Sequence, residues 1–327
     1  MTGAGGPAGI AVVRAVLALG CKVVAVDANS WSVGLQLADH GAVVPLSYSP
    51  GFVDAVGKIA EQYQAKYLVA TVAEELPSLR NKVERLSDFG LATWLPDVAA
   101  IDSCTDKWLF FEVATALGIP TPATALGMAN EVPGPWIVKP RWGRGSRHVY
   151  SVDHQDELAV VIRWVPDPIV QTRASGNEFT VDCLVDHDLN LVGAVPRWRV
   201  ETKAGISTRG ETFSDASVLG LVERLLVGLK LQGPSNVQGF VQLDGQVVIT
   251  EVNPRFSGGL PLSLAAGADL VGEYLRGMAG LPIRPERLIA RDGVTMARYH
   301  EELFGEATPA SPSTGNDTGT TPGVAAS

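Results

Sequence analysis

The pattern of hydrophobic and polar positions changes near residue 95, and the change divides the chain into two differently built parts. Up to residue 95, short apolar runs typical of buried strands alternate with amphipathic stretches typical of helices. Strands are predicted at 22–27, 43–44 and 67–71, and helices at 7–19, 31–40, 52–64 and 73–88. This alternation favours a doubly wound α/β arrangement around a parallel sheet.

After residue 95 the pattern favours antiparallel sheets with fewer helices. Strands are predicted at 136–140, 147–152, 168–172, 178–186, 189–200, 237–243 and 246–252, and helices at 105–117, 154–164 and 214–230. The pair Asp244-Gly245 between two apolar runs is a strong signal for a tight hairpin turn. The predicted fold class is therefore α/β followed by α+β, with domains at 1–95, 96–170 and 171–304.

The two ends of the chain raise separate expectations. Residues 305–327 are mostly Gly, Pro, Ser, Thr and Ala, so they have little apolar surface to bury and are predicted to be disordered. At the other end, the glycine-rich turn at 3–6 normally follows a first strand, yet only two residues precede it. Either the true start lies upstream or the sheet lacks a member, and we favour the former.

Composition narrows the function classes. The chain of 327 residues is 46% hydrophobic and 19% charged, with a net charge of −9, which argues against general nucleic-acid binding because that needs a basic face. The apolar run at 9–26 contains Arg14 and Lys22, so no membrane span is predicted. Without a targeting pattern or metal-like spacing of its three cysteines, the chain is predicted to be reduced and cytoplasmic.

The most informative segment is the predicted strand end at 247–253 and the turn after it. Glu251 and Asn253 are two residues apart, so their side chains share one face of a strand. A carboxylate and an amide oxygen on one face suit a hard cation such as Mg²⁺. Arg255 follows closely enough to reach phosphates that the cation would hold. The alternative is an ordinary strand end with a polar turn, and the upstream motifs favour the metal site.

Two lysines and a glycine-rich loop are candidates for binding phosphates. Lys139 ends an apolar strand just before the loop at 141–146, whose glycines let backbone N–H groups turn towards phosphate oxygens. Lys107 opens a helix further upstream. Each signal is weak alone, because the loop lacks the Walker pattern and a lone lysine at a helix start is usually solvated.

Together, and in this order, these motifs resemble the ATP-grasp family, in its carbamoyl-phosphate-synthase-like branch of carboxylate–amine ligases. The resemblance covers residues 1 to about 300 and implies an ATP-grasp fold with an N-terminal Rossmann-like domain and antiparallel-sheet ATP-binding subdomains. In chain order the shared motifs are Asp106-Lys107, Ile137-Val138-Lys139-Pro140 with its glycine loop, Val170-Gln171, Gly176-x-Glu178, Asn236-Val237-Gln238 and Glu251-x-Asn253-Pro254-Arg255.

The resemblance implies ATP and Mg²⁺, or Mn²⁺ in its place, as cofactors, and a role for each matching residue. Arg255 and Lys139 would be catalytic, with Arg255 stabilising charge on the transferred phosphoryl group. Mg²⁺ would be held by Gln238, Glu251 and Asn253. The nucleotide would be bound by Lys107 and Lys139 at the α- and β-phosphates, by the lid residues Gly143, Arg144, Gly145 and Ser146, by Gln171 and Thr172 at the adenine, next to a slot lined by Val170, and by Glu178 at the ribose.

Two positions depart from the commonest family pattern. Gln238 stands where many members have an acid, so the metal site has one negative charge fewer and we expect weaker or more Mg²⁺-dependent binding. Gln171 also replaces a common acid, but its amide can still serve the adenine.

Several polar residues outside these motifs leave alternatives open. The segment at 197–210 is predicted to be a basic loop that either closes over an acyl phosphate or stays solvated, with Arg197 or Arg199 as a candidate ligand for the substrate carboxylate. Glu74-Glu75 fits a solvated helix start better than the lining of a cleft. His187 is predicted to lie in an exposed turn.

The reaction implied by the resemblance is ATP-dependent ligation of a small carboxylate to an amine through an acyl phosphate, in a chain that could pair as a homodimer. Carbamoyl phosphate formation itself is disfavoured, because it usually needs two such units and the sequence shows one. Two other classes remain open. One is a non-catalytic ATP-binding regulatory protein. The other is an NAD(P)-dependent oxidoreductase, which the turn at 3–6 with Asp27 after the second strand suggests.

Overall fold

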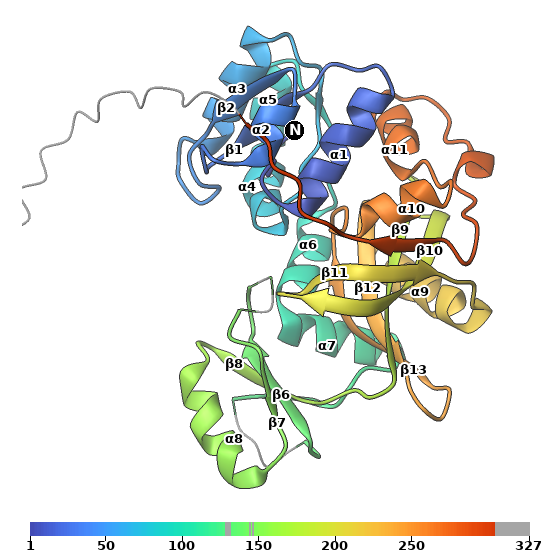
Figure 1. The fold of residues 1–327 in the computed structure, drawn as a ribbon. Helices are drawn as coiled ribbons and strands as arrows, with labels where there is room; N and C mark the ends of the chain where they lie inside the picture. Colours follow the sequence, from blue (N-terminus) through green and yellow to red (C-terminus); the bar gives the residue numbers. More distant parts are fainter. Residues whose placement is uncertain (128–131, 144, 146, 305–327) are drawn as a thin grey trace, which may run out of the picture.

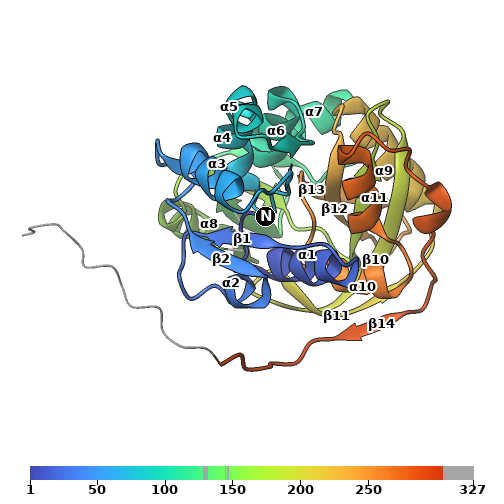
Figure 2. The ribbon, with the colours of Figure 1, turned by 90° about the horizontal axis from the view of Figure 1, so that it is seen from above.

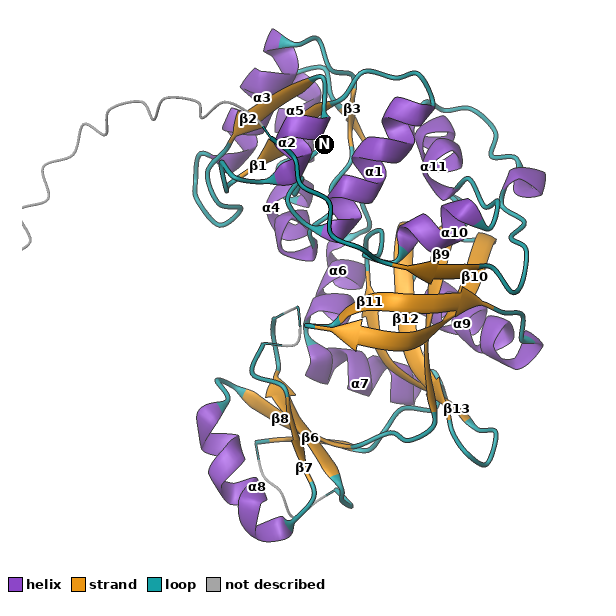
Figure 3. Ribbon diagram, in the orientation of Figure 1, coloured by secondary structure: helices purple, strands orange, loops and turns teal. Residues whose placement is uncertain are grey.

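The computed structural model describes residues 1–127, 132–143, 145 and 147–304, which form three groups of elements (Figure 1). An N-terminal group of helices and parallel strands lies at one end, a six-stranded sheet at the centre, and a small four-stranded sheet at the other end (Figure 3). None of the helices in these described residues is long and apolar enough to cross a bilayer.

The N-terminal group contains parallel strand pairs, as its alternating pattern predicted. Its elements are α1 (Pro7–Ala18), β1 (Val24–Asp27), α2 (Val33–Leu37), β2 (His40–Val43), α3 (Phe52–Gln62), β3 (Tyr67–Leu68), η1 (Ala73–Glu75), α4 (Leu76–Arg80), α5 (Val83–Asp88) and β4 (Ala92–Thr93). The pairs β1–β2 and β3–β4 are parallel, and Thr2 bridges Val26 and Ala70 between them. One face packs against α1 and α2, and the other against α3 to α5 (Figure 2).

Several details of this group differ from the sequence-based expectation. The helix predicted at 31–40 ends at Leu37, the strand predicted at 43–44 is β2 (His40–Val43), and β4 was not predicted. The predicted helix at 73–88 is three short elements, because Pro77 lies in the first turn of α4, where a proline is accepted, and Lys82 leaves helical geometry before α5. Glu75 is buried and accepts a hydrogen bond from the Thr2 hydroxyl, so the prediction of a solvated position is wrong for Glu75. Its neighbour Glu74 is exposed, as predicted.

The central sheet is antiparallel and has the strand order β13-β12-β9-β10-β11-β14. Its strands are β9 (Asn177–Val185), β10 (Leu191–Lys203), β11 (Ile206–Thr212), β12 (Gly233–Val241), β13 (Val247–Asn253) and β14 (Thr295–Ala297). The helices around it are α6 (Val98–Thr105), α7 (Lys107–Ala116), α9 (Ala216–Gly228), α10 (Leu260–Ala265), α11 (Leu270–Met278) and η4 (Pro285–Arg287). α6, α7 and α9 share one hydrophobic core with the sheet, while α10, α11 and α1 share another.

Alternation along the strands separates apolar from polar side chains. On β9, Phe179 and Val181 point into the core beneath α9, while Thr180 and Asp182 lie on the opposite face. The register continues this polar face sideways, because Gln238 of β12 lies opposite Thr180. Polar side chains far apart in the sequence are therefore neighbours on one face of the sheet.

The segment at 197–210 is a β-hairpin and not a loop, so that prediction is wrong. β10 continues to Lys203, turns at Ala204-Gly205, and returns as β11. Both turn residues have positive φ, 48° and 74°, which is the geometry of a tight hairpin turn with the twist of the flanking strands. The strand is hard to predict from the sequence, because charged residues stand at every second position from Arg197 to Lys203 and the apolar alternation that marks a strand is missing.

The small sheet has the antiparallel order β5-β8-β6-β7. Its elements are β5 (Thr124–Leu126), β6 (Trp136–Pro140), β7 (Tyr150–Val152), α8 (Gln155–Val161), η3 (Ile162–Trp164) and β8 (Pro168–Thr172), so the strand predicted at 147–152 begins three residues later than expected. Val138 and Val170 face α8, which covers one side of the sheet (Figure 1). The opposite side carries Lys139 and Gln171.

An aromatic stack joins the N-terminal group to the central sheet. The Trp94 ring is 3% exposed and lies between His187 and Tyr274, with ring centroids 4.1 Å and 5.2 Å away. The Tyr274 hydroxyl donates to the Trp94 carbonyl at 2.9 Å. His187 itself lies in an exposed turn, as predicted. The stack fixes the point at which the chain passes from one group to the other.

Candidate functional site

Lys139 is a buried cation on the inner face of the small sheet. It is 8% exposed, and its Nζ donates to the Gln171 Oε1 at 3.0 Å. The Gln171 amide is fixed in turn, because its Nε2 donates to the Thr124 hydroxyl at 2.9 Å. Burial lowers the pKa of Lys139 to about 8, the Glu251 carboxylate partly offsets this, and Lys107 lowers it further. Lys139 and Glu251 are thus electrostatic neighbours, although they lie on different sheets.

Lys107 and the glycine loop are joined at the start of α7. The Lys107 Nζ donates to the Gly143 carbonyl at 2.9 Å, and its backbone N–H donates to the Arg141 carbonyl at 3.1 Å. Asp106 caps the helix by accepting from the next amides and also binds the Arg141 guanidinium through both oxygens, at 2.7 Å and 2.6 Å. Burial alone would raise the pKa of Asp106, but these hydrogen bonds bring it below its usual value.

The predicted metal ligands lie side by side on β12 and β13. Gln238 is directly opposite Glu251, and Asn236 is directly opposite Asn253. The Asn253 amide donates to the Glu251 Oε1 at 2.8 Å. Burial would raise the pKa of Glu251, but the charges of Lys107 and Lys139 hold it below its usual value. Glu251 is therefore ionised at neutral pH.

Asn236 connects these residues to Arg255, a link that sequence reasoning missed. The Asn236 Nδ2 donates to the Arg255 carbonyl at 3.0 Å, and its Oδ1 accepts from the amides of Gln238 and Asn253, both at 3.4 Å. These bonds turn the amide NH₂ groups towards Asn236 and their oxygens away from it, and the Asn253 Oδ1 accepts from the Arg255 Nη2 at 3.3 Å. The signal was present in the sequence, since Asn236 precedes Gln238 by two residues and so shares its face.

The donor set fits a hard cation that is bound together with phosphates. The residues offer one carboxylate from Glu251 and amide oxygens from Gln238 and Asn253, which are the ligand types that Mg²⁺ accepts. Among the described residues there is no cluster of three His, Cys, Asp or Glu side chains, which zinc or iron would favour. With so little negative charge, these residues would depend on phosphate oxygens to complete the coordination.

Glu178 and Thr172, which are predicted to bind the ribose and the adenine, each contact another residue of the chain. The Arg199 Nε lies 2.9 Å from the Glu178 Oε1, at an angle that does not make it a hydrogen bond. The Thr172 hydroxyl donates to the Pro133 carbonyl at 2.7 Å. Arg144 and Ser146, which were also predicted to bind nucleotide, lie outside the described residues. Gly143 and Gly145 have positive φ, 130° and 65°, a region that glycine adopts readily.

Two arginines differ from expectation. Arg197 was one candidate for binding the substrate carboxylate, but it is 2% exposed and paired with Asp182, so this prediction is wrong. Arg298 follows β14 and was not predicted, yet its Nη2 donates to the Gly258 carbonyl in the turn after β13. Burial and the nearby Arg197 charge lower the pKa of Arg298. Its place just after a distant edge strand left no signal in the sequence.

The residue behind the oxidoreductase alternative is engaged within its own turn. The Asp27 carboxylate accepts hydrogen bonds from the Gly5 amide at 2.7 Å and the Asn29 amide at 2.9 Å. It thereby ties the turn at 3–6 to the end of β1. The pairing of a glycine-rich turn with Asp27 therefore has a structural explanation that needs no dinucleotide.

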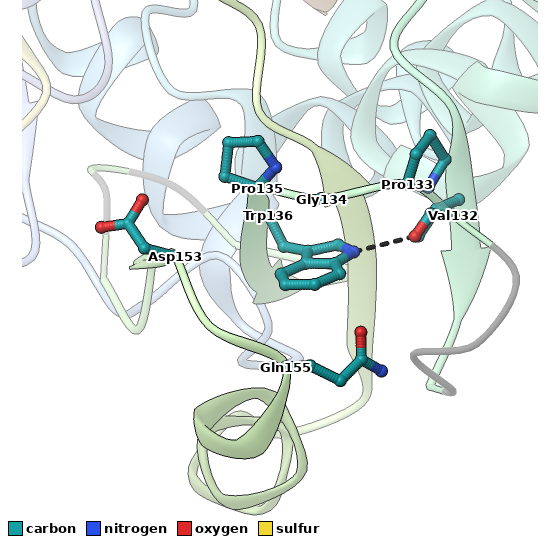
Figure 4. A pocket seen from close by; sticks show the side chains of 7 residues that line it. All are labelled: Val132, Pro133, Gly134, Pro135, Trp136, Asp153 and Gln155. Atoms are coloured by element: carbon teal, nitrogen blue, oxygen red, sulfur yellow. Dashed lines mark hydrogen bonds between the residues drawn. The ribbon is translucent and has the colours of Figure 1, made fainter.

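A depression of about 680 Å³ lies on the other side of the small sheet (Figure 4). The Trp136 indole lines it and donates to the Val132 carbonyl at 2.9 Å. The carboxylate at its rim, Asp153, pairs with Arg173 at 2.7 Å. Because Trp136 and Lys139 point to opposite faces of β6, this depression is separate from the charged site.

The pKa of Lys139 predicts opposite effects of pH on ligand affinity and on stability. As pH rises through about 8, the folded protein loses this cation, so the affinity for MgADP that the sequence predicts should fall up to about tenfold per pH unit. Because the folded pKa is below the usual 10.5, the unfolded chain binds more protons between about 8 and 10.5, and Lys139 adds stability with rising pH there. Calorimetric titration and urea unfolding, each compared with Lys139→Met, test both signs. Equal pH profiles in the two proteins would contradict the prediction.

Comparison of the sequence with known proteins finds a matching family and a related protein. Residues 165–301 match a family described as ATP-grasp in the biosynthetic pathway with Ter operon. The carbamoyl phosphate synthase large chain of Agathobacter rectalis is 28% identical over 213 residues, covering 56% of this chain and 20% of that protein. The chain thus spans about a fifth of the length of the curated relative it matches.

Several solved structures superpose on most of the chain. The biotin carboxylase domain of Hydrogenobacter thermophilus 2-oxoglutarate carboxylase, in complex with MgADP, ADP and bicarbonate, gives a TM-score of 0.71 at 18% identity and covers 88% of this chain and 71% of its own. N5-carboxyaminoimidazole synthetase from Staphylococcus aureus, complexed with ADP, gives 0.70 at 14%, covering 86% and 77%. The L-amino acid ligase of Bacillus licheniformis gives 0.65 at 17%, covering 82% and 70%. At these identities the likeness shows the fold alone.

Proposed function

On the premise that this chain is a member of the ATP-grasp superfamily, we propose that it is an ATP-dependent ligase that activates a small carboxylate as an acyl phosphate for attack by an amine. One observation carries the proposal. Lys139 and Lys107 both lie close enough to the Glu251 carboxylate on the facing sheet to lower its pKa, and Glu251 in turn raises the pKa of Lys139. Two cations opposite one carboxylate in a partly buried space suit a metal-bound triphosphate.

The chain's own residues would bind and orient the reactants. Lys107 and Lys139 would hold phosphate oxygens, and Glu251, Asn253 and Gln238 would hold Mg²⁺. The bound cation would neutralise charge that develops on the transferred phosphoryl group.

Arg255 would stabilise the same developing charge from the turn after β13. Its Nη1 donates to the Phe256 carbonyl at 2.8 Å, which holds the guanidinium close to the predicted ligand Asn253. Arg298 adds a second cation beside the same turn, and together the two arginines would offer a binding place to the substrate carboxylate, which is the phosphoryl acceptor.

A screen of ADP release tests this proposal. Purified protein with MgATP is assayed over pairs of small carboxylates and amines, with Lys139→Ala and Glu251→Ala as controls. Release that requires both a carboxylate and an amine, and that both variants abolish, supports the ligase. MgATP binding without turnover on any pair would favour the regulatory alternative, and tight NADH binding without ATP binding would favour the oxidoreductase.

Gln238→Glu is expected to lower the Mg²⁺ requirement. Glutamate at this position would place a second carboxylate opposite Glu251, and adding ligand charge strengthens binding of hard cations. The half-saturating concentration of free Mg²⁺ in the ADP-release assay should fall about tenfold. Gln246→Glu, at the far end of the same hairpin, is the matched control and should change nothing. An unchanged Mg²⁺ curve for Gln238→Glu would remove this residue from the metal site.

A further inference from the structure

A buried ion pair lies directly beneath the turn that follows β13. The Arg197 Nε donates to the Asp182 Oδ2 at 2.9 Å, and its Nη2 lies 3.3 Å from the Asp182 Oδ1. Both residues are 2% exposed. The Ser263 hydroxyl donates to the same carboxylate, so strands β9 and β10 and helix α10 meet at this pair.

The pair holds the turn from below through a serine. The Arg197 Nη2 donates to the Ser257 Oγ at 2.8 Å, and the same oxygen accepts from the Gly259 amide at 3.1 Å. A Cβ at 259 would lie 2.2 Å from the Arg197 Cζ, so any other residue there would displace the guanidinium from its partners. The guanidinium and the turn are therefore in direct contact with no space between them.

Hydrogen bonding within the fold does not account for the whole guanidinium. Its Nη1 is buried and has no hydrogen-bond partner among the described residues. Burying a charge and leaving one of its donors unsatisfied is unfavourable, and a pair of apolar side chains would often serve stability as well. Because this arginine adds little to stability, its contact with the turn points to a role in positioning that turn.

We infer that Arg197, held by Asp182, is a positioning residue that fixes the turn at 256–259 and thereby the orientation of Arg255. The inference rests on the proposed ligase function. Arg255 precedes this turn directly, and its Nη1 is bonded to the Phe256 carbonyl, so a shift of the turn moves the guanidinium. Arg298 is bonded to the Gly258 carbonyl and would move with it. Arg197 itself is 2% exposed, so it would act through the turn and not by contact with a ligand.

Arg197→Lys tests the inference, with Arg284→Lys as a matched control. Arg284 also pairs with a fully buried carboxylate, that of Glu273, in a part of the fold away from the site. For Arg197→Lys we expect kcat for ADP release to fall about 100-fold, as a displacement of about 1 Å can cause, while the Kd for MgADP stays within about threefold. For Arg284→Lys both constants should stay unchanged even if the Tm falls.

Hydrogen exchange gives a readout that does not depend on activity. Exchange in the peptide spanning 254–260 should rise in Arg197→Lys and stay at the wild-type level in Arg284→Lys, because the Gly259 amide loses its fixed acceptor only in the first variant. Unchanged kcat, or equal losses in kcat and MgADP affinity without local exchange, would overturn the positioning role. Failure of the wild-type protein to bind MgADP would instead overturn the proposed ligase.

Discussion

Lys139→Met should reduce ADP release about 100- to 1,000-fold, the cost of removing one positioned donor from developing charge in a water-poor site. Methionine keeps an unbranched apolar stem close to the length of the lysine side chain but cannot donate to Gln171 or to a phosphate oxygen. Because Lys139 contributes to holding the pKa of Glu251 down, that pKa should rise in the variant. Steady-state ADP release and calorimetric titration with MgADP measure the effect.

Lys58→Met is the control for Lys139→Met, because Lys58 is exposed on α3, far from the charged site in the fold. It should match the wild-type protein in both assays. Wild-type kinetics for Lys139→Met, with a similar Tm, would show that the buried ammonium does not contact the reacting phosphates.

Glu251→Gln is expected to have an effect of similar size for a different reason. Glu251 is the only carboxylate of the predicted metal set, and its loss would leave three neutral amides opposite two lysines. We expect ADP release to fall on the order of 100-fold or more, with a higher Mg²⁺ requirement. Because Glu251 raises the pKa of Lys139, the midpoint of the pH dependence of MgADP binding should also move below about 8.

Glu223→Gln on the exposed side of α9 removes the same charge from the chain without touching the sheet. It should leave both the Mg²⁺ curve and the pH midpoint in place. If Glu251→Gln and Glu223→Gln behaved alike, the carboxylate on β13 would have no part in metal binding.

The sequence predicted the strands around the candidate site well, because the relevant signals are local. Val247–Asn253 shows the apolar run, the period of two and the Asp244-Gly245 turn within a dozen residues. Lys139 stands at the end of a similar run in β6. In both places the spacing that defines the strand also sets which side chains share a face.

What the sequence did not predict depends on contacts between distant segments. Nothing near Arg197 in the sequence indicates that Asp182 lies across the strand pair, so the local pattern favours a substrate ligand in a loop over a buried, paired arginine. Arg298 reaches the site only because β14 joins the edge of the central sheet. Glu75 is buried beside Thr2, which lies 73 residues away in the sequence. Local propensity cannot carry this information.

The separation of chemistry and core onto opposite faces of β9 limits how this chain can vary. Inserting or deleting one residue within the strand would move every side chain beyond that point to the opposite face of the sheet. Asp182 would then lie in the hydrophobic core, and Val181 would leave it. Insertions and deletions in related sequences should therefore occur mainly in the hairpin turns, such as 186–190 and 242–246. Inside the strands they should occur only as two residues at a time or as β-bulges that restore the register.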